Sequence, residues 1–111
     1  PAKEIEKLIE RTRQAGAEIV SYLKTGSAFY APAAGVALMV KSILNDEKKV
    51  LPVSLYLDGE YGLKDVCLGV PVRLGLRGAE EIVKITLSDE EKESLFTSAE
   101  SVQKDIALLY L

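Results

Sequence analysis

A stretch without charge places the strongest constraint on the fold of this chain. Residues 25–40 carry no charged side chain, although 28% of the whole sequence is charged. Within the stretch, residues 31–40 are small or apolar around the full circumference of a helix rather than along one side. Such a helix must be covered on all sides, and it is too short for the roughly 20 apolar residues of a membrane span. We therefore expect other protein to enclose it.

The overall composition excludes several functional classes. The 111 residues suit one domain, and 48% hydrophobic content indicates a soluble globular protein. A net charge of −3 disfavours a nucleic-acid partner, and no polybasic segment favours a membrane surface. The single cysteine, Cys67, permits neither an intrachain disulfide nor a cysteine-rich metal site. No signal peptide is visible, so we expect a cytoplasmic location. The start at Pro1 instead of methionine suggests N-terminal processing or a piece of a longer protein.

Two helices are predicted in the first half of the chain. Apolar residues recur at helical spacing over residues 2–23, opposite a charged face. Gly16 lowers the stability of this helix by about 1 kcal/mol relative to alanine, so we expect a close contact there. A Thr-Gly-Ser triplet ends the helix, and we interpret Ser27 as the cap of the next one. The second helix is predicted to reach about residue 45, with Pro32 in its first turn, where a missing N–H does least harm.

Three strands and a final helix are predicted in the second half. Apolar residues alternate over 51–57 and 66–74, and a third strand is predicted through 83–87. Pro71 should lie where the sheet needs no hydrogen bond. The short connections favour an antiparallel meander. Ser88 and Glu91 form a capping box, and the last helix carries an apolar stripe of Leu95, Ala99, Val102, Ile106 and Leu109. The order of two helices, three strands and one helix places the chain in the α+β class.

The residue chemistry does not support an enzyme that acts by itself. The chain has no histidine, the usual group for proton transfer near neutral pH. We interpret Cys67 as a small buried filler rather than a nucleophile. The acidic residues at 89–91 are explained by a helix start, and those at 80–81 by a solvated loop. The loop at 75–78 joins two strands instead of leading into a helix, so it is not a phosphate-binding fingerprint. We predict neither a catalytic residue nor a metal site in this chain.

Two blocks carry a family resemblance that spans nearly the whole chain in unbroken order. The first block consists of Gly-Ala-Glu-Ile-Val at 16–20 and Leu-Lys-Thr-Gly-Ser-Ala-Phe-Tyr-Ala-Pro-Ala-Ala at 23–34. The second consists of Val-Leu-Pro-Val-Ser at 50–54, Tyr-Leu-Asp-Gly-Glu-Tyr-Gly at 56–62 and Gly-Val-Pro-Val at 69–72. Both resemble the C-terminal part of the NAD-dependent lactate/malate dehydrogenase family. Within that family they are most similar to the malate enzymes built like lactate dehydrogenase.

The resemblance implies that residues 1–111 are a portion of a C-terminal, substrate-binding domain. The family's N-terminal Rossmann domain, which binds NAD, would be absent, together with the catalytic histidine–aspartate pair and the arginines that hold the substrate. The implied activity of the intact enzyme is the interconversion of malate and oxaloacetate by hydride transfer, in the tricarboxylic acid cycle. The implied partners are the missing N-terminal half and further copies of the enzyme, as a dimer or tetramer. This chain alone would be inactive.

Two site residues follow from the resemblance. Ala28 matches a position beside the bound substrate, where lactate dehydrogenases typically carry threonine and the malate enzymes a small residue. Pro32 matches a position that faces the nicotinamide ring. Two alternatives stay open: a fragment of a lactate or other 2-hydroxyacid dehydrogenase, and a non-catalytic interaction domain with the same fold. The second alternative would make the first helix and the alanine-rich helix partner surfaces.

Overall fold

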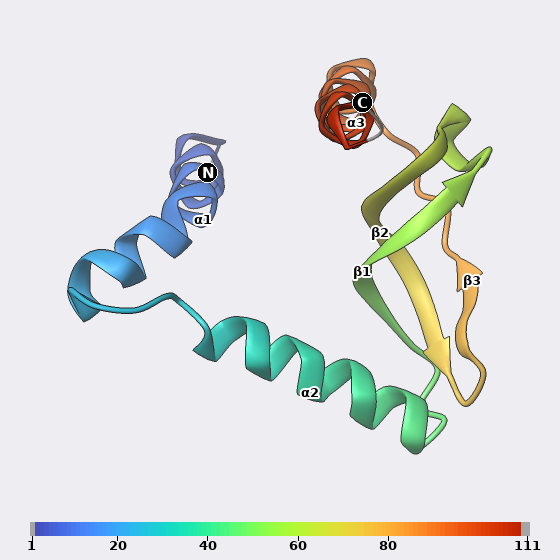
Figure 1. The fold of residues 1–111 in the computed structure, drawn as a ribbon, viewed down its shortest axis with the longest axis horizontal. Coiled ribbons are helices and arrows are strands. Elements are labelled where there is room, and N and C mark those ends of the chain that lie inside the picture. The colour runs from blue at the N-terminus through green and yellow to red at the C-terminus, as the bar shows by residue number, and fades with distance from the viewer. Residues whose placement is uncertain (1, 110–111) are drawn as a thin grey trace. The chain divides into compact units, whose positions relative to one another are not determined.

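The computed structural model describes residues 2–109 (Figure 1). In chain order the elements are α1 (Ala2–Leu23), α2 (Tyr30–Leu44), β1 (Lys49–Asp58), the 3-10 turn η1 (Glu60–Gly62), β2 (Lys64–Gly75), β3 (Gly78–Ile82) and α3 (Asp89–Leu108). This order confirms the predicted α+β class. The chain divides into two compact units, with the boundary between Leu38 and Met39 inside α2. No helix within residues 2–109 is both long and apolar enough to cross a membrane.

The first unit contains α1 and the start of α2. Helix α1 has the predicted bounds and ends where Lys24 and Gly26 adopt positive φ values of 61° and 92°. The contact expected at Gly16 is wrong for the described residues, because no atom lies within 4 Å of a Cβ placed there. Gly16 therefore leaves open space on the helix surface.

The start of α2 corrects one prediction and confirms another. The helix begins at Tyr30, and the Phe29 carbonyl accepts its first helical hydrogen bond from Ala33 N at 2.9 Å. Phe29 therefore holds the cap position, and the prediction of Ser27 as the cap is wrong because Ser27 lies two residues earlier. Pro32 lies in the first turn, as predicted, where its missing N–H leaves no helical hydrogen bond unmade.

The second unit is built on an antiparallel sheet in the order β1-β2-β3, which confirms the predicted meander. The register pairs Leu57 with Val66 and Val53 with Val70, so the apolar stripes of β1 and β2 share one face. Helix α3 packs against this face through Ala99, which is buried. The buried hydrophobic core comprises Leu57, Leu63, Val66, Val70, Val72, Leu74 and Ala99.

The third strand lies earlier than predicted. Strand β3 covers Gly78–Ile82 and follows β2 through a tight turn, whereas residues 83–87 lie outside the sheet. Val72 pairs with Ile82, so Pro71 stands opposite Val83. Val83 N donates to the Pro71 carbonyl at 2.8 Å, but proline has no N–H to return the bond. The ladder therefore stops at Pro71. Toward β1, Pro71 faces Pro52, where neither proline is needed as a donor.

The predicted capping box of α3 is confirmed, whereas the prediction that Cys67 is buried is wrong. Ser88 Oγ accepts from Glu91 N at 3.2 Å, and Ser88 N donates to the Glu91 carboxylate at 2.8 Å. Cys67 is exposed. It pairs with Tyr56 on the sheet face opposite the core, which has no covering layer within this unit. Leu109, the last residue of the predicted stripe, is 82% exposed and lies beyond the helix.

A buried hydrogen bond joins the C-terminal end of α2 to the sheet. Ser42 has no exposed surface, and its hydroxyl donates to the Leu74 carbonyl at 3.0 Å. Met39 and Ile43, on the same helix, pack against the core. The bond gives the buried Ser42 hydroxyl a partner, and it fixes where the end of α2 contacts β2.

An ionic cluster secures the same junction at the surface. The Lys48 ammonium lies 2.9 Å from an Asp46 carboxylate oxygen and 2.7 Å from a Glu80 oxygen. Asp46 also accepts from Leu76 N at 2.7 Å, so it binds the β2–β3 turn. The hydrogen bond from Lys48 is the main cause that lowers the pKa of both Asp46 and Glu80. In return, the hydrogen bonds to Glu80 and then Asp46 raise the pKa of Lys48.

Replacing Ser42 with alanine tests the buried joint. We expect Ser42→Ala to lower the free energy of unfolding by about 0.5–1.5 kcal/mol, because the buried hydrogen bond to the Leu74 carbonyl is lost. Urea unfolding followed by circular dichroism measures the change. Ser98→Ala is the control, since its hydroxyl donates to the Ser94 carbonyl at 3.0 Å on an exposed turn of α3. Equal losses of unfolding free energy in the two variants would show that the buried bond contributes no more to stability than the exposed one.

The ionic cluster predicts an acid-sensitive stability. A carboxyl group whose pKa is lowered on folding stabilises the native state above its unfolded pKa, and this contribution is lost as the pH falls through the folded value. We expect the free energy of unfolding to be level from pH 7 to about pH 5 and to fall below about pH 4. Glu80→Gln should reduce the acid slope, and Lys48→Gln should reduce it similarly by removing the cation. Acid slopes unchanged in both variants, in urea titrations across this range, would contradict a role for the cluster.

Candidate functional site

The two predicted site residues flank the start of α2 in the first unit. Ala28 is half-buried in the segment that joins α1 to α2, and Pro32 is exposed in the first turn of the helix. Between them, the rings of Phe29 and Tyr30 stack with centroids 4.6 Å apart and an interplanar angle of 28°. The structure therefore places Ala28 and Pro32 on one short stretch of backbone beside an aromatic pair.

Residues 25–40 can contact a ligand through apolar side chains, hydroxyl groups and backbone groups, but not through a charged side chain. Residues 25–40 offer no carboxylate, amine, imidazole or thiol that could transfer a proton or attack a substrate. The first turn of α2 leaves backbone N–H groups without helical partners, and the positive end of the helix dipole favours a nearby negative charge. The arrangement can thus contact a small, negatively charged ligand, and its one ionisable side chain is the phenol of Tyr30.

Sequence reasoning missed the aromatic pair. Phe29 and Tyr30 are 56% and 70% exposed, which is unusual for stacked rings in a stretch without charge. The two aromatic residues are adjacent in the sequence, but adjacency does not predict that their rings stack. The stacking is seen only in the structure. The roles of Ala28 and Pro32 stay predictions at this point, because they rest on the family resemblance.

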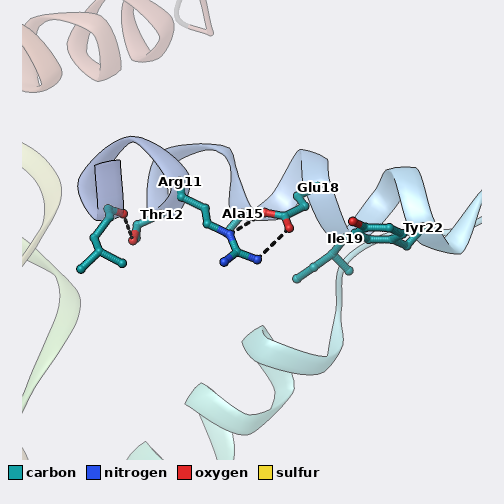
Figure 2. Close-up of a pocket in the computed structure, with 7 residues that line it drawn as sticks. Arg11, Thr12, Ala15, Glu18, Ile19 and Tyr22 are labelled. Atoms are coloured by element: carbon teal, nitrogen blue, oxygen red, sulfur yellow. Dashed lines mark hydrogen bonds and ion pairs between the residues drawn. The ribbon is translucent and has the colours of Figure 1, made fainter. Parts of the chain in front are cut away.

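A hollow lies along one side of α1, and its lining includes one positively and one negatively charged side chain (Figure 2). Arg11 and Glu18 face each other across it, with guanidinium-to-carboxylate distances of 2.9 and 3.2 Å. The pair raises the pKa of Arg11 and lowers that of Glu18, first through the hydrogen bonds and then through charge. The hollow measures about 360 Å³ and is lined by Leu8, Arg11, Thr12, Ala15, Glu18, Ile19 and Tyr22. Its two charges neutralise each other, so it presents a mainly apolar surface.

The described residues hold no metal-binding cluster. Within residues 2–109, no three histidine, cysteine, aspartate or glutamate side chains come together in a way that could hold an ion. The Asp46 and Glu80 carboxylates are both paired with the Lys48 ammonium.

Comparison with known proteins gives consistent matches along the chain. Residues 1–109 match the model of the lactate/malate dehydrogenase family, alpha/beta C-terminal domain. A malate dehydrogenase of Trichormus variabilis is 60% identical over 105 residues, which cover 95% of this chain and 32% of that protein. A solved malate dehydrogenase from Salinibacter ruber aligns with a TM-score of 0.91 at 47% identity, over 97% of this chain and 35% of that one. A lactate dehydrogenase from Eimeria maxima, solved with NADH and oxamate, gives a TM-score of 0.88 at 38% identity, over 98% and 35%.

These matches combine near-complete coverage of this chain with partial coverage of the relatives. The chain spans about a third of the length of the proteins it matches. The TM-scores of 0.91 and 0.88, at 47% and 38% identity, show that the chain shares the fold of these solved domains. The chain therefore belongs to the lactate/malate dehydrogenase family and corresponds to its alpha/beta C-terminal domain.

Proposed function

We propose that this chain is the C-terminal portion of an NAD-dependent malate dehydrogenase that interconverts malate and oxaloacetate. The observation that carries the proposal is the 60% identity to a malate dehydrogenase over 95% of the chain. The lactate dehydrogenase match is weaker, at 38% identity. In this reaction NAD, when bound, accepts or returns the hydride, and the protein supplies binding, orientation and charge.

The proposed division of labour follows from the residues that this chain contains. It has no histidine, and the phenol of Tyr30 is the one ionisable side chain in residues 25–40. Proton transfer and the binding of the substrate carboxylates would therefore belong to the preceding part of the enzyme. The exposed ring of Pro32 fits a contact with the flat nicotinamide, whereas the turn at 75–78 is a hairpin that offers no phosphate site. NAD would thus be bound mainly by the N-terminal half.

Ala28 is the proposed determinant of substrate size. A methyl side chain leaves space that a threonine would fill, and oxaloacetate is larger than pyruvate by one carboxylate. The unpartnered N–H groups at the start of α2 would also suit that added negative charge. The proposed role of Ala28 is therefore to leave room, while other residues recognise the charge.

The proposed partners are the N-terminal half and further copies of the enzyme, in a dimer or tetramer. Exposed apolar side chains support this, because Val36, Val40 and Leu44 of α2 are between 46% and 72% exposed. Apolar area of this kind is typical of a surface that another protein covers. We also propose a cytoplasmic location in the tricarboxylic acid cycle, in keeping with one exposed thiol and no disulfide.

A chimera tests the proposed function. The chain is joined to the preceding two thirds of the Trichormus variabilis malate dehydrogenase, in place of the matching third. We expect NAD-dependent oxidation of malate by the chimera, because the missing proton-transfer groups and the cofactor domain are restored. The 111-residue chain alone should show neither turnover nor NAD binding. A folded chimera without activity would contradict the proposal and favour a non-catalytic interaction domain.

Substitution of Ala28 tests its role in the same chimera. We expect Ala28→Thr to lower kcat/KM for oxaloacetate by at least about tenfold and to lower that for pyruvate less, because added methyl and hydroxyl groups occupy the space of the second carboxylate. Steady-state kinetics with both substrates measures the ratio. Ala33→Thr, on the exposed side of α2, is the matched control. An unchanged ratio in Ala28→Thr would exclude the pocket role while leaving the malate dehydrogenase assignment intact.

A further inference from the structure

Residues 83–88 connect β3 to α3 and form one wall of an apolar cavity. The cavity measures about 290 Å³ and is lined by Tyr61, Ile85, Thr86, Leu87, Lys92, Leu95 and Phe96. A smaller hollow of about 80 Å³ shares Tyr61, Ile85, Leu87 and Leu95 with it. Both lie within the second unit. Because these residues form one wall, the width of the space depends on what holds residues 83–88 in place.

The sheet holds these residues by one hydrogen bond only. Val83 N donates to the Pro71 carbonyl at 2.8 Å, and an ordinary residue at position 71 would return a bond to the Val83 carbonyl. Proline has no N–H and leaves that carbonyl without a partner from β2.

The hydroxyl of Tyr61 supplies the missing donor. It donates to the Val83 carbonyl at 3.2 Å and accepts from Ile85 N, also at 3.2 Å. One phenol oxygen from the β1–β2 loop therefore bridges two backbone groups of the connector. It takes over the hydrogen bonding at the point where the β2–β3 ladder ends.

The backbone around Tyr61 is shaped to hold the ring in this position. Tyr61 has a φ of 54°, in the left-handed region that aromatic residues rarely adopt. Gly59 and Gly62, with φ of 120° and 76°, make the turns on both sides. A non-glycine residue persists in this region when its surroundings fix it. The half-buried ring and its two hydrogen bonds provide that fixation here.

We propose that Tyr61 is a latch and that residues 83–88 are a strap that opens the apolar cavity when the latch releases. In the released state, the Tyr61 hydroxyl exchanges its two backbone partners for water, and Val83–Leu87 moves away while β1 and β2 stay paired. The cavity is large enough for one small apolar group or ring. The device depends on Pro71, because a residue with an N–H there would hold the strap without Tyr61.

Removal of the hydroxyl tests the latch. In Tyr61→Phe we expect amide hydrogen exchange at Ile85 to accelerate by at least about fivefold, the factor that corresponds to one net hydrogen bond. Amides of β1 and the first half of β2 should keep their protection. Trypsin should also cleave faster after Lys84, which is exposed in the strap. Tyr56→Phe is the matched control, because its hydroxyl donates only to the Asp65 side chain, at 2.6 Å.

A variant that restores the N–H at position 71 distinguishes a latch role of Tyr61 from a general effect on stability. We expect Pro71→Ala to return an N–H to the Val83 carbonyl, so that Tyr61→Phe in the Pro71→Ala background causes a smaller increase in cleavage after Lys84. Three outcomes would overturn the proposal. The first is exchange in Tyr61→Phe no faster than in Tyr56→Phe, and the second is equal loss of protection across the whole sheet. An undiminished effect in the double variant would show that Pro71 plays no part and would also overturn it.

Discussion

Burial of the apolar stripe shared by β1 and β2 is the interaction on which the described fold depends. Leu57, Val66 and Val72 keep at most 1% of their surface exposed, and each such side chain contributes about 1.5–3 kcal/mol when it leaves water. The stripe needs a cover, and α3 provides it through Ala99 while the end of α2 provides it around Ser42. The hydrogen bond from Ser42 to the Leu74 carbonyl shows how tight this junction is, because a hydroxyl enters the interior only where it can donate.

The apolar stripe shared by β1 and β2 is only partly covered by the two helices. The inward residues of β1 from Leu51 to Leu55 stay half-exposed, although they face the same side as fully buried Leu57. Most residues of helix α2 are small or apolar, yet Val36, Val40 and Leu44 are between 46% and 72% exposed. A family whose members are about three times as long offers the simplest physical explanation. On the proposed function, the rest of the enzyme would complete a core that this domain only begins.

Local patterns predicted the elements whose formation depends on nearby residues. Alternation in β1 and β2, the apolar stripe of α3 and the capping box at Ser88 all act within a few residues, so they are visible in the sequence. Strand β3 was misplaced because its end depends on Pro71, a residue in another strand that cannot donate. The exposure of Cys67 was also missed, because alternation shows which face a residue occupies but not whether a second layer covers that face. Roles for Ala28 and Pro32 could be proposed only through the long resemblance, since an alanine and a proline carry no ionisable or nucleophilic group.

The proposed site joins two kinds of residue that have different freedom to change. A group that transfers a proton needs a set pKa, so its surroundings must stay nearly constant. Residues 25–40 carry no carboxylate, amine, imidazole or thiol. A change at Ala28 therefore alters the volume of the side chain without disturbing such a group within the stretch. On the proposed function, substrate choice can therefore change by one side chain in this domain while proton and hydride transfer, performed elsewhere, stay intact.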